Sequence, residues 1–180
     1  QLKNSEGKNW PWHVRGGFSF VDPELKMIAL ESDKPGYLFT YDEPVVINMR
    51  VNTAKDSGKE MKASYAVYDM NNNEMTKGEV AFMSEKGNIV PITLDITQRG
   101  TFVLDVTVDG WESRHTTFAR IPDVQKVTNG EPTRFGNCNI LNPASDERIN
   151  LRCGVAQRLG LTIVRNWLNW QAAQPGPDLL

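Results

Sequence analysis

The amino-acid sequence predicts a mainly β protein with an antiparallel β-sandwich over 1–122, a linker over 123–133 and a single β-strand–helix–β-strand (βαβ) unit over 134–180. Three observations lead to this prediction. Short runs that alternate apolar and polar residues, separated by turn residues, continue as far as Ile121. A segment with Asn-Gly, Pro and few large apolar residues follows. A helical pattern then lies between two short runs of strand type.

Two strands are predicted most clearly, at 45–51 and 102–108. Alternation gives each strand one apolar face, made of Val45, Ile47, Met49 and Val51 in the first and of Phe102, Leu104, Val106 and Val108 in the second. Asp109-Gly110 follows the second strand and predicts a type I′ hairpin turn into a strand over 111–121.

Further strands are expected at 63–68, 79–84 and 89–96. Asn71-Asn72-Asn73 marks a turn after the first of these, because asparagine tolerates a positive φ. Lys86-Gly87-Asn88 predicts a hairpin that joins the other two. Strands at this spacing are typical of an immunoglobulin-like or related antiparallel sandwich.

The βαβ unit is predicted from its boundaries. After a strand over 134–140, Ser145 is placed to cap a helix with its side chain, and Gly160 is placed to end it. The run 161–164 reads as a strand buried on both faces of a parallel sheet. A broad apolar helix face is expected to pack on that sheet, formed by Ile149, Cys153 and Ala156 together with Leu151, Val155 and Leu159.

The two cysteines, Cys138 and Cys153, lie on the first strand and the helix of this unit. We expect both to be free, buried and small. A disulfide between them requires Cα atoms within about 7 Å, and this alternative stays open.

Composition excludes several classes of function. The formal net charge is −2 and no long run of like charges occurs, so we expect no nucleic-acid partner. No apolar stretch approaches the roughly 18 residues that span a bilayer. The polar start at Gln1 fits an exported protein without its signal, or equally a trimmed chain. We therefore expect a secreted, periplasmic or cell-surface protein.

No metal or cofactor is expected. The two histidines, His13 and His115, lack a Cys or His partner at ligand spacing. Gly136 stands alone, without the glycine pattern of a dinucleotide site.

The residues after the linker carry a recognisable pattern: Arg-Phe-Gly-Asn-Cys-Asn-Ile at 134–140, Leu-Gly-Leu-Thr-Ile-Val-Arg at 159–165, Asn-Trp-Leu-Asn-Trp at 166–170 and Gln-Pro-Gly-Pro at 174–177. This pattern resembles the start of the catalytic (β/α)₈ barrel in the large clan A type of retaining glycoside hydrolases, which includes β-galactosidases, β-xylosidases and many endoglycanases. In that clan, F-G-x-N opens strand one, L-G-x-x-x-V-R runs from helix one through strand two, and W-x-x-x-x-P forms the following loop.

The sandwich is more loosely similar to the accessory β-domains that precede such barrels. Asp-Glu-Pro-Val at 42–45 and Gly-Thr-Phe-Val-Leu-Asp-Val at 100–106 carry that similarity. The resemblance implies that the chain is the N-terminal part of a glycoside hydrolase whose barrel is incomplete here.

The resemblance also implies substrate-binding residues. Arg165, at the end of strand two, would hydrogen-bond the nucleophilic carboxylate and keep it ionised. Trp167 and Trp170 would offer flat faces to sugar rings, and Asn139 would donate to a hydroxyl. The alternatives are barrel packing for both tryptophans and an ordinary salt bridge for Arg165.

No catalytic residue is assigned, because the clan's two acids stand at the ends of strands four and seven. We expect this chain alone to be inactive and the parent to hydrolyse a polysaccharide or oligosaccharide with retention. The alternative is a non-catalytic extracellular module whose sandwich binds glycan or protein through its loops. A parallel pair with one helix leaves strand edges exposed, so we expect it to pack on the sandwich or to self-associate.

Overall fold

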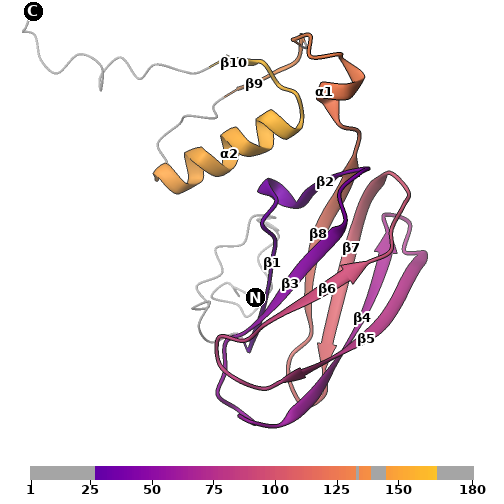
Figure 1. Cartoon of the computed structure of the whole chain (residues 1–180), viewed down its shortest axis with the longest axis vertical. Coiled ribbons are helices and arrows are strands. Elements are labelled where there is room, and N and C mark those ends of the chain that lie inside the picture. Colours follow the sequence, from indigo (N-terminus) through magenta and orange to yellow (C-terminus); the bar gives the residue numbers. More distant parts are fainter. Residues whose placement is uncertain (1–26, 133, 139–144, 166–180) are drawn as a thin grey trace, which may run out of the picture.

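The computed structural model describes residues 27–132, 134–138 and 145–165 (Figure 1). The strands of the sandwich are β1 (Ile28–Glu31), β2 (Leu38–Thr40), β3 (Val45–Val51), β4 (Glu60–Asp69), β5 (Glu74–Met83), β6 (Ile89–Leu94), β7 (Gly100–Val108) and β8 (Arg114–Ile121). The remaining elements are the 3₁₀ turn η2 (Pro35–Tyr37), the one-turn helix α1 (Val124–Val127), β9 (Gly136–Cys138), α2 (Asp146–Arg158) and β10 (Ile163–Arg165).

Two sheets form the predicted sandwich. One has three strands in the order β1-β3-β6, and the other has five in the order β2-β8-β7-β4-β5. All neighbours are antiparallel except β2 and β8, which are parallel. This connectivity corresponds to immunoglobulin strands A, B and E facing C′, C, F and G, with β2 added beside the last strand. The immunoglobulin-like sandwich therefore has one parallel pair that the strand patterns did not predict.

The core lies between the two sheets. The apolar faces predicted for 45–51 and 102–108 are buried on opposite sides of it, with the eight predicted side chains at most 3% exposed. Phe39, Phe82, Ile92 and Phe118 complete its centre. The period-two alternation thus located the core correctly.

The hairpin predicted through Lys86–Asn88 is wrong. β5 pairs with β4 and β6 pairs with β3, so this segment crosses from one sheet to the other. Its backbone is tied to the end of β3: the Gly87 N–H donates to the Val51 carbonyl (2.7 Å) and the Val51 N–H donates to the Asn88 carbonyl (2.9 Å). A turn signal marks where the chain bends but does not identify the next strand's partner.

The hairpin between β7 and β8 is confirmed, but its turn type is not. Gly110 has a φ of +73°, whereas Asp109 is not among the residues with positive φ. A type I′ turn needs positive φ at both central positions. The predicted turn at 71–73 is present, with Asn72 at a φ of +63°.

The predicted strand–helix–strand order is present, but the second strand is not buried on both faces as predicted, because Ile163 is 55% exposed. β9 and β10 are parallel neighbours, with α2 between them in sequence. Gly160 has a φ of +66° and ends the helix, where the Leu161 N–H donates to the Ala156 carbonyl (2.9 Å). The helix start differs from prediction, because Ser145 makes no side-chain capping hydrogen bond. Its backbone carbonyl accepts from the Ile149 N–H instead (3.0 Å).

The expected apolar face of α2 is also wrong. Ala156 is its one buried residue, while Leu151 and Leu159 are 52% and 41% exposed. Cys153 is free as expected but exposed rather than buried. The reason is that α2 packs on η2 of the sandwich through Gly154 and Val155. In Figure 1, α2 accordingly lies beside η2 and β2.

α1 lies within the segment predicted as a linker. Among the described residues, no helix has the length and hydropathy needed to cross a membrane.

Candidate functional site

One of the four predicted substrate-binding residues, Arg165, lies in the described β9–α2–β10 unit. Arg165 is the last residue of β10, is exposed, and pairs in register with Cys138 at the end of β9. Because the two strands are parallel, their carboxyl ends meet at one edge. Asn139, Trp167 and Trp170 lie outside the described residues. The roles assigned to all four stay predictions.

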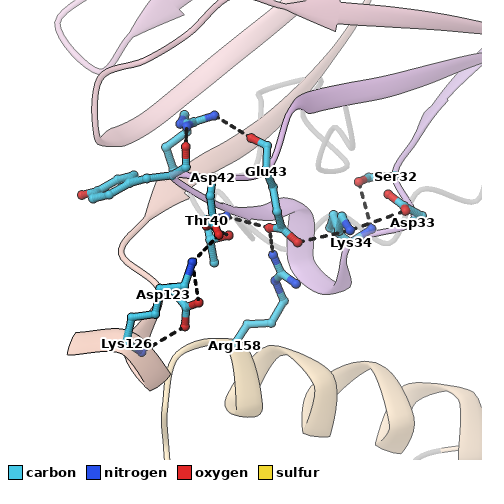
Figure 2. Close-up of polar contacts among 11 residues, drawn as sticks. Ser32, Asp33, Lys34, Thr40, Asp42, Glu43, Asp123, Lys126 and Arg158 are labelled. Carbon is cyan, nitrogen blue, oxygen red and sulfur yellow. Dashed lines mark hydrogen bonds and ion pairs between the residues drawn. The ribbon is translucent and has the colours of Figure 1, made fainter. Parts of the chain in front are cut away.

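A second polar site joins this unit to the sandwich. We call it the joint and define it as Lys34, Thr40, Glu43 and Arg158 (Figure 2). The Glu43 carboxylate accepts a hydrogen bond from the Thr40 backbone N–H (2.7 Å) and one from the Arg158 guanidinium. The Lys34 ammonium lies 3.2 Å from its other oxygen. One carboxylate therefore links η2, the β2–β3 turn and the last turn of α2.

The joint favours the ionised form of Glu43. Burial alone raises the pKa of this carboxyl, but the hydrogen bonds from Thr40, Arg158 and Lys34 outweigh it and bring the pKa from 4.5 to about 2. Glu43 is thus an anion at any physiological pH, and the attachment of α2 does not depend on small changes in pH.

Arg120 positions the turn that carries Glu43. This residue is buried in β8, and its guanidinium donates to the carbonyls of Tyr41 (2.5 Å) and Glu43 (3.0 Å). Its Nε has no partner within the described part of the chain. Two bonds from a planar donor hold the turn's backbone in one conformation, which aims the Glu43 side chain at α2.

A more exposed ion pair lies beside the joint. The Lys126 ammonium of α1 is 2.5 Å from Asp42 and 3.8 Å from Asp123. Hydrogen bonds from Lys126, from the Thr40 hydroxyl and from the backbone bring the pKa of Asp42 to about 2. Because these side chains are largely exposed to solvent, the pair adds little stability.

Two glycines allow α2 to approach η2. A Cβ at Gly154 would lie 2.9 Å from Pro35 Cγ, and a Cβ at Gly36 would lie 2.7 Å from Val155 Cγ2. Side chains at either position would push the helix away from the sandwich.

We expect Gly36→Ala to lower the free energy of unfolding by about 1–2 kcal/mol more than Gly58→Ala does. Both glycines have positive φ, at +67° and +78°, so both variants carry the same backbone strain. Only Gly36 faces a close neighbour, since nothing lies within 4 Å of a Cβ at Gly58. Urea denaturation measures the difference, and hydrogen exchange should show faster exchange in α2 for the Gly36 variant alone. Equal effects of the two variants would contradict tight packing of α2 on η2.

The joint borders a hollow of about 490 Å³, with Thr40 and Asp42 on one side and Gly154 and Gln157 on the other. The adjacent charges of Asp42 and Glu43 are paired with Lys126 and Arg158, so the arrangement fastens two units. Asp42 and Glu43 stand within a motif quoted from the sequence, but no role was predicted for them. The sequence analysis did not single out Lys34, Arg120 or Arg158.

Comparisons with known proteins give no family. No family model and no curated protein matches the chain. Among solved structures, it is similar to a superoxide reductase (neelaredoxin) from Ignicoccus hospitalis, at 14% identity and a TM-score of 0.39, over 53% of this chain and 81% of that one.

Two further structures are similar to parts of the chain. A polysaccharide lyase matches at 15% identity and a TM-score of 0.37, over 66% of this chain and 15% of that one. A DUF3244 family protein with an immunoglobulin-like β-sandwich fold from Bacteroides vulgatus matches at 10% identity and a TM-score of 0.32, over 53% of this chain and 98% of that one. Similarities this low carry no argument about function.

Proposed function

We propose that this chain is the N-terminal part of a retaining glycoside hydrolase that acts outside the cytoplasm on a polysaccharide or oligosaccharide. The carrying observation is the parallel β9–α2–β10 unit, which falls on the residues whose pattern resembles the start of a glycosidase barrel. In this proposal, β9 and β10 are barrel strands one and two, and the joint fixes the first barrel helix to the sandwich.

The position of Arg165 supports the proposal. Barrel enzymes build their active sites at the carboxyl ends of the strands, and Arg165 is the last residue of β10. There its guanidinium would hydrogen-bond the nucleophilic carboxylate and lower that group's pKa. Trp167, Trp170 and Asn139 come after the same two strands in the chain and would contact the sugar.

The exposed apolar side chains of the unit also support it. Phe135 and Ile163 are 74% and 55% exposed, and β9 and β10 have only each other as neighbours within the described residues. Further strands and helices of a barrel would cover these groups. The same exposed edges support the self-association that we propose for the chain without such a barrel.

The test uses the product of the whole coding sequence, including any codons after Leu180. We expect it to hydrolyse a chromogenic β-glycoside with retention, and we expect Arg165→Ala to lower kcat/KM by about 10²–10³-fold. Arg99→Ala is the matched control, because this exposed arginine lies in the sandwich, between β6 and β7. The 180-residue chain should show no hydrolysis.

A product that lacks hydrolytic activity on a panel of β-glycosides would overturn the proposal. An active enzyme in which the Arg165 variant keeps full kcat/KM, with an unchanged pH profile, would remove Arg165 from the site while leaving the glycosidase function in place.

A second function, a non-catalytic glycan-binding module, is favoured by one observation. The outer face of the five-stranded sheet carries a polar hollow of about 420 Å³, which is lined by none of the residues of the joint. The same hydrolysis assay on the whole gene product separates this function from the first.

A further inference from the structure

The hollow on the five-stranded sheet follows from the order of side-chain sizes across three strands. On the solvent face of β4, Ser64 and Ala66 are small. Ser64 lies in register between Glu79 of β5 and Thr107 of β7, and Ala66 lies between Lys77 and Asp105. Directly opposed residues on neighbouring strands point to the same face. A low floor is therefore flanked by two rows of longer side chains, and we call this feature the trough.

Tyr68 bounds the trough along β4. It is two residues beyond Ala66, on the same face, and is half-buried. The register between β4 and β5 shifts between Val67 and Tyr68, so β5 has one extra residue there. Such a bulge increases the local twist of the strands. The trough thus ends against an aromatic side chain.

The polar groups of the trough include both donors and acceptors. Asp105 has no hydrogen-bond or ion-pair partner among the residues that the structure describes, and the Lys77 ammonium is 2.9 Å from Glu74 at the rim. The Ser64 hydroxyl donates to the Thr107 carbonyl (3.3 Å), and the Thr107 hydroxyl is 2.9 Å from that of Ser113. These groups form a mixed surface in which carboxylates and an ammonium stand a few residues apart.

This mixture of charges selects among ligands. Asp105 would repel a polyanion such as nucleic acid or an acidic polysaccharide, whereas the Glu79 carboxylate lies 3.5 Å from the Lys62 ammonium. A neutral polyhydroxylated chain is not repelled by charges of either sign. Its hydroxyl groups can both donate to and accept from the side chains of the trough. Its sugar rings also have apolar faces that can lie against Tyr68.

We propose that the trough is a binding site for a short stretch of neutral polysaccharide, with Asp105 and Lys77 as hydrogen-bonding residues and Tyr68 as the apolar contact. This proposal rests on the proposed function of a glycan-binding module and names the ligand class and the residues of its site. It also extends to the hydrolase, in which the trough would hold substrate remote from the barrel.

The test measures binding by the full chain. Affinity electrophoresis and calorimetry are run with soluble β-glucan, xylan and galactan as neutral probes and with polygalacturonate as the anionic probe. We expect at least one neutral glycan to bind and polygalacturonate not to bind. Asp105→Ala and Tyr68→Ala should each weaken binding about tenfold or more.

A steric variant tests the location independently of hydrogen bonding. Ala66→Trp fills the floor without touching the core and should abolish binding, whereas Thr117→Trp, on the same face but outside the trough, should not. Asp95→Asn is the control for charge, because Asp95 is an exposed carboxylate that directly follows β6 of the three-stranded sheet. Circular dichroism confirms that each variant is folded.

The outcomes are distinguishable. Failure of every neutral glycan to bind overturns both the module function and this site. Binding that survives Ala66→Trp and Asp105→Ala leaves the module function standing and overturns the trough. Preference for polygalacturonate overturns the neutral ligand class.

Discussion

Phe118→Ala is expected to lower the free energy of unfolding by about 3–5 kcal/mol. Phe118 is 1% exposed and joins three strands of the five-stranded sheet. Its ring is stacked on Phe102 with centroids 5.4 Å apart and meets Phe39 edge to face at 6.2 Å. The truncation removes both contacts and leaves a cavity that the rigid strands around it cannot fill.

Urea denaturation followed by circular dichroism measures this loss. His115→Ala is the matched control: it lies on the same strand, β8, but faces solvent, and should change stability by less than about 0.5 kcal/mol. A loss below about 1 kcal/mol for the Phe118 variant would show that the sandwich core is not closed as described.

Glu43→Gln is expected to remove about 2 kcal/mol of stability at neutral pH and almost none near pH 2. The joint brings the Glu43 pKa from 4.5 to about 2, and each pKa unit corresponds to about 1.4 kcal/mol. Because a quarter of the side chain remains exposed, at 24%, solvent screening reduces the full value.

The sign follows from proton binding. Between pH 4.5 and about 2 the unfolded chain holds a proton on Glu43 that the folded chain does not, so stability rises with pH in this window. The difference between wild type and Glu43→Gln should be complete above pH 4.5 and should vanish as the pH falls. Urea denaturation across this range measures it, with the exposed Glu85→Gln as control. A difference that does not change with pH would mean that the carboxylate's charge does not hold the joint.

The sequence predicts the sandwich well where one face of a strand is buried. Ile47 and Leu104 lie in period-two runs, and burial of alternate residues is the physical cause of that period. The same rule cannot pair strands that lie in different sheets, because Ile92 in β6 is buried whichever strand is its neighbour. The hairpin prediction through Gly87 failed for this reason.

The candidate sites were predictable to different degrees. Arg165 could be placed at a strand end because strand, helix and Gly160 leave local signals. The joint has no local sequence signal, since Glu43 and Arg158 are 115 residues apart and each is a charged residue of the kind common on protein surfaces. The trough depends on register between β4, β5 and β7, which single-strand patterns do not contain.

The sequence separation across the joint has a consequence for biosynthesis. Chains are made from the N-terminus and domains fold as units, so the sandwich is complete once Ile121 has left the ribosome. Thr40 and Lys34, which contact Glu43 in the folded chain, also precede Ile121 in the sequence. Arg158 is synthesised later and binds a Glu43 side chain that belongs to the folded sandwich. The sandwich therefore acts as a template on which α2 docks.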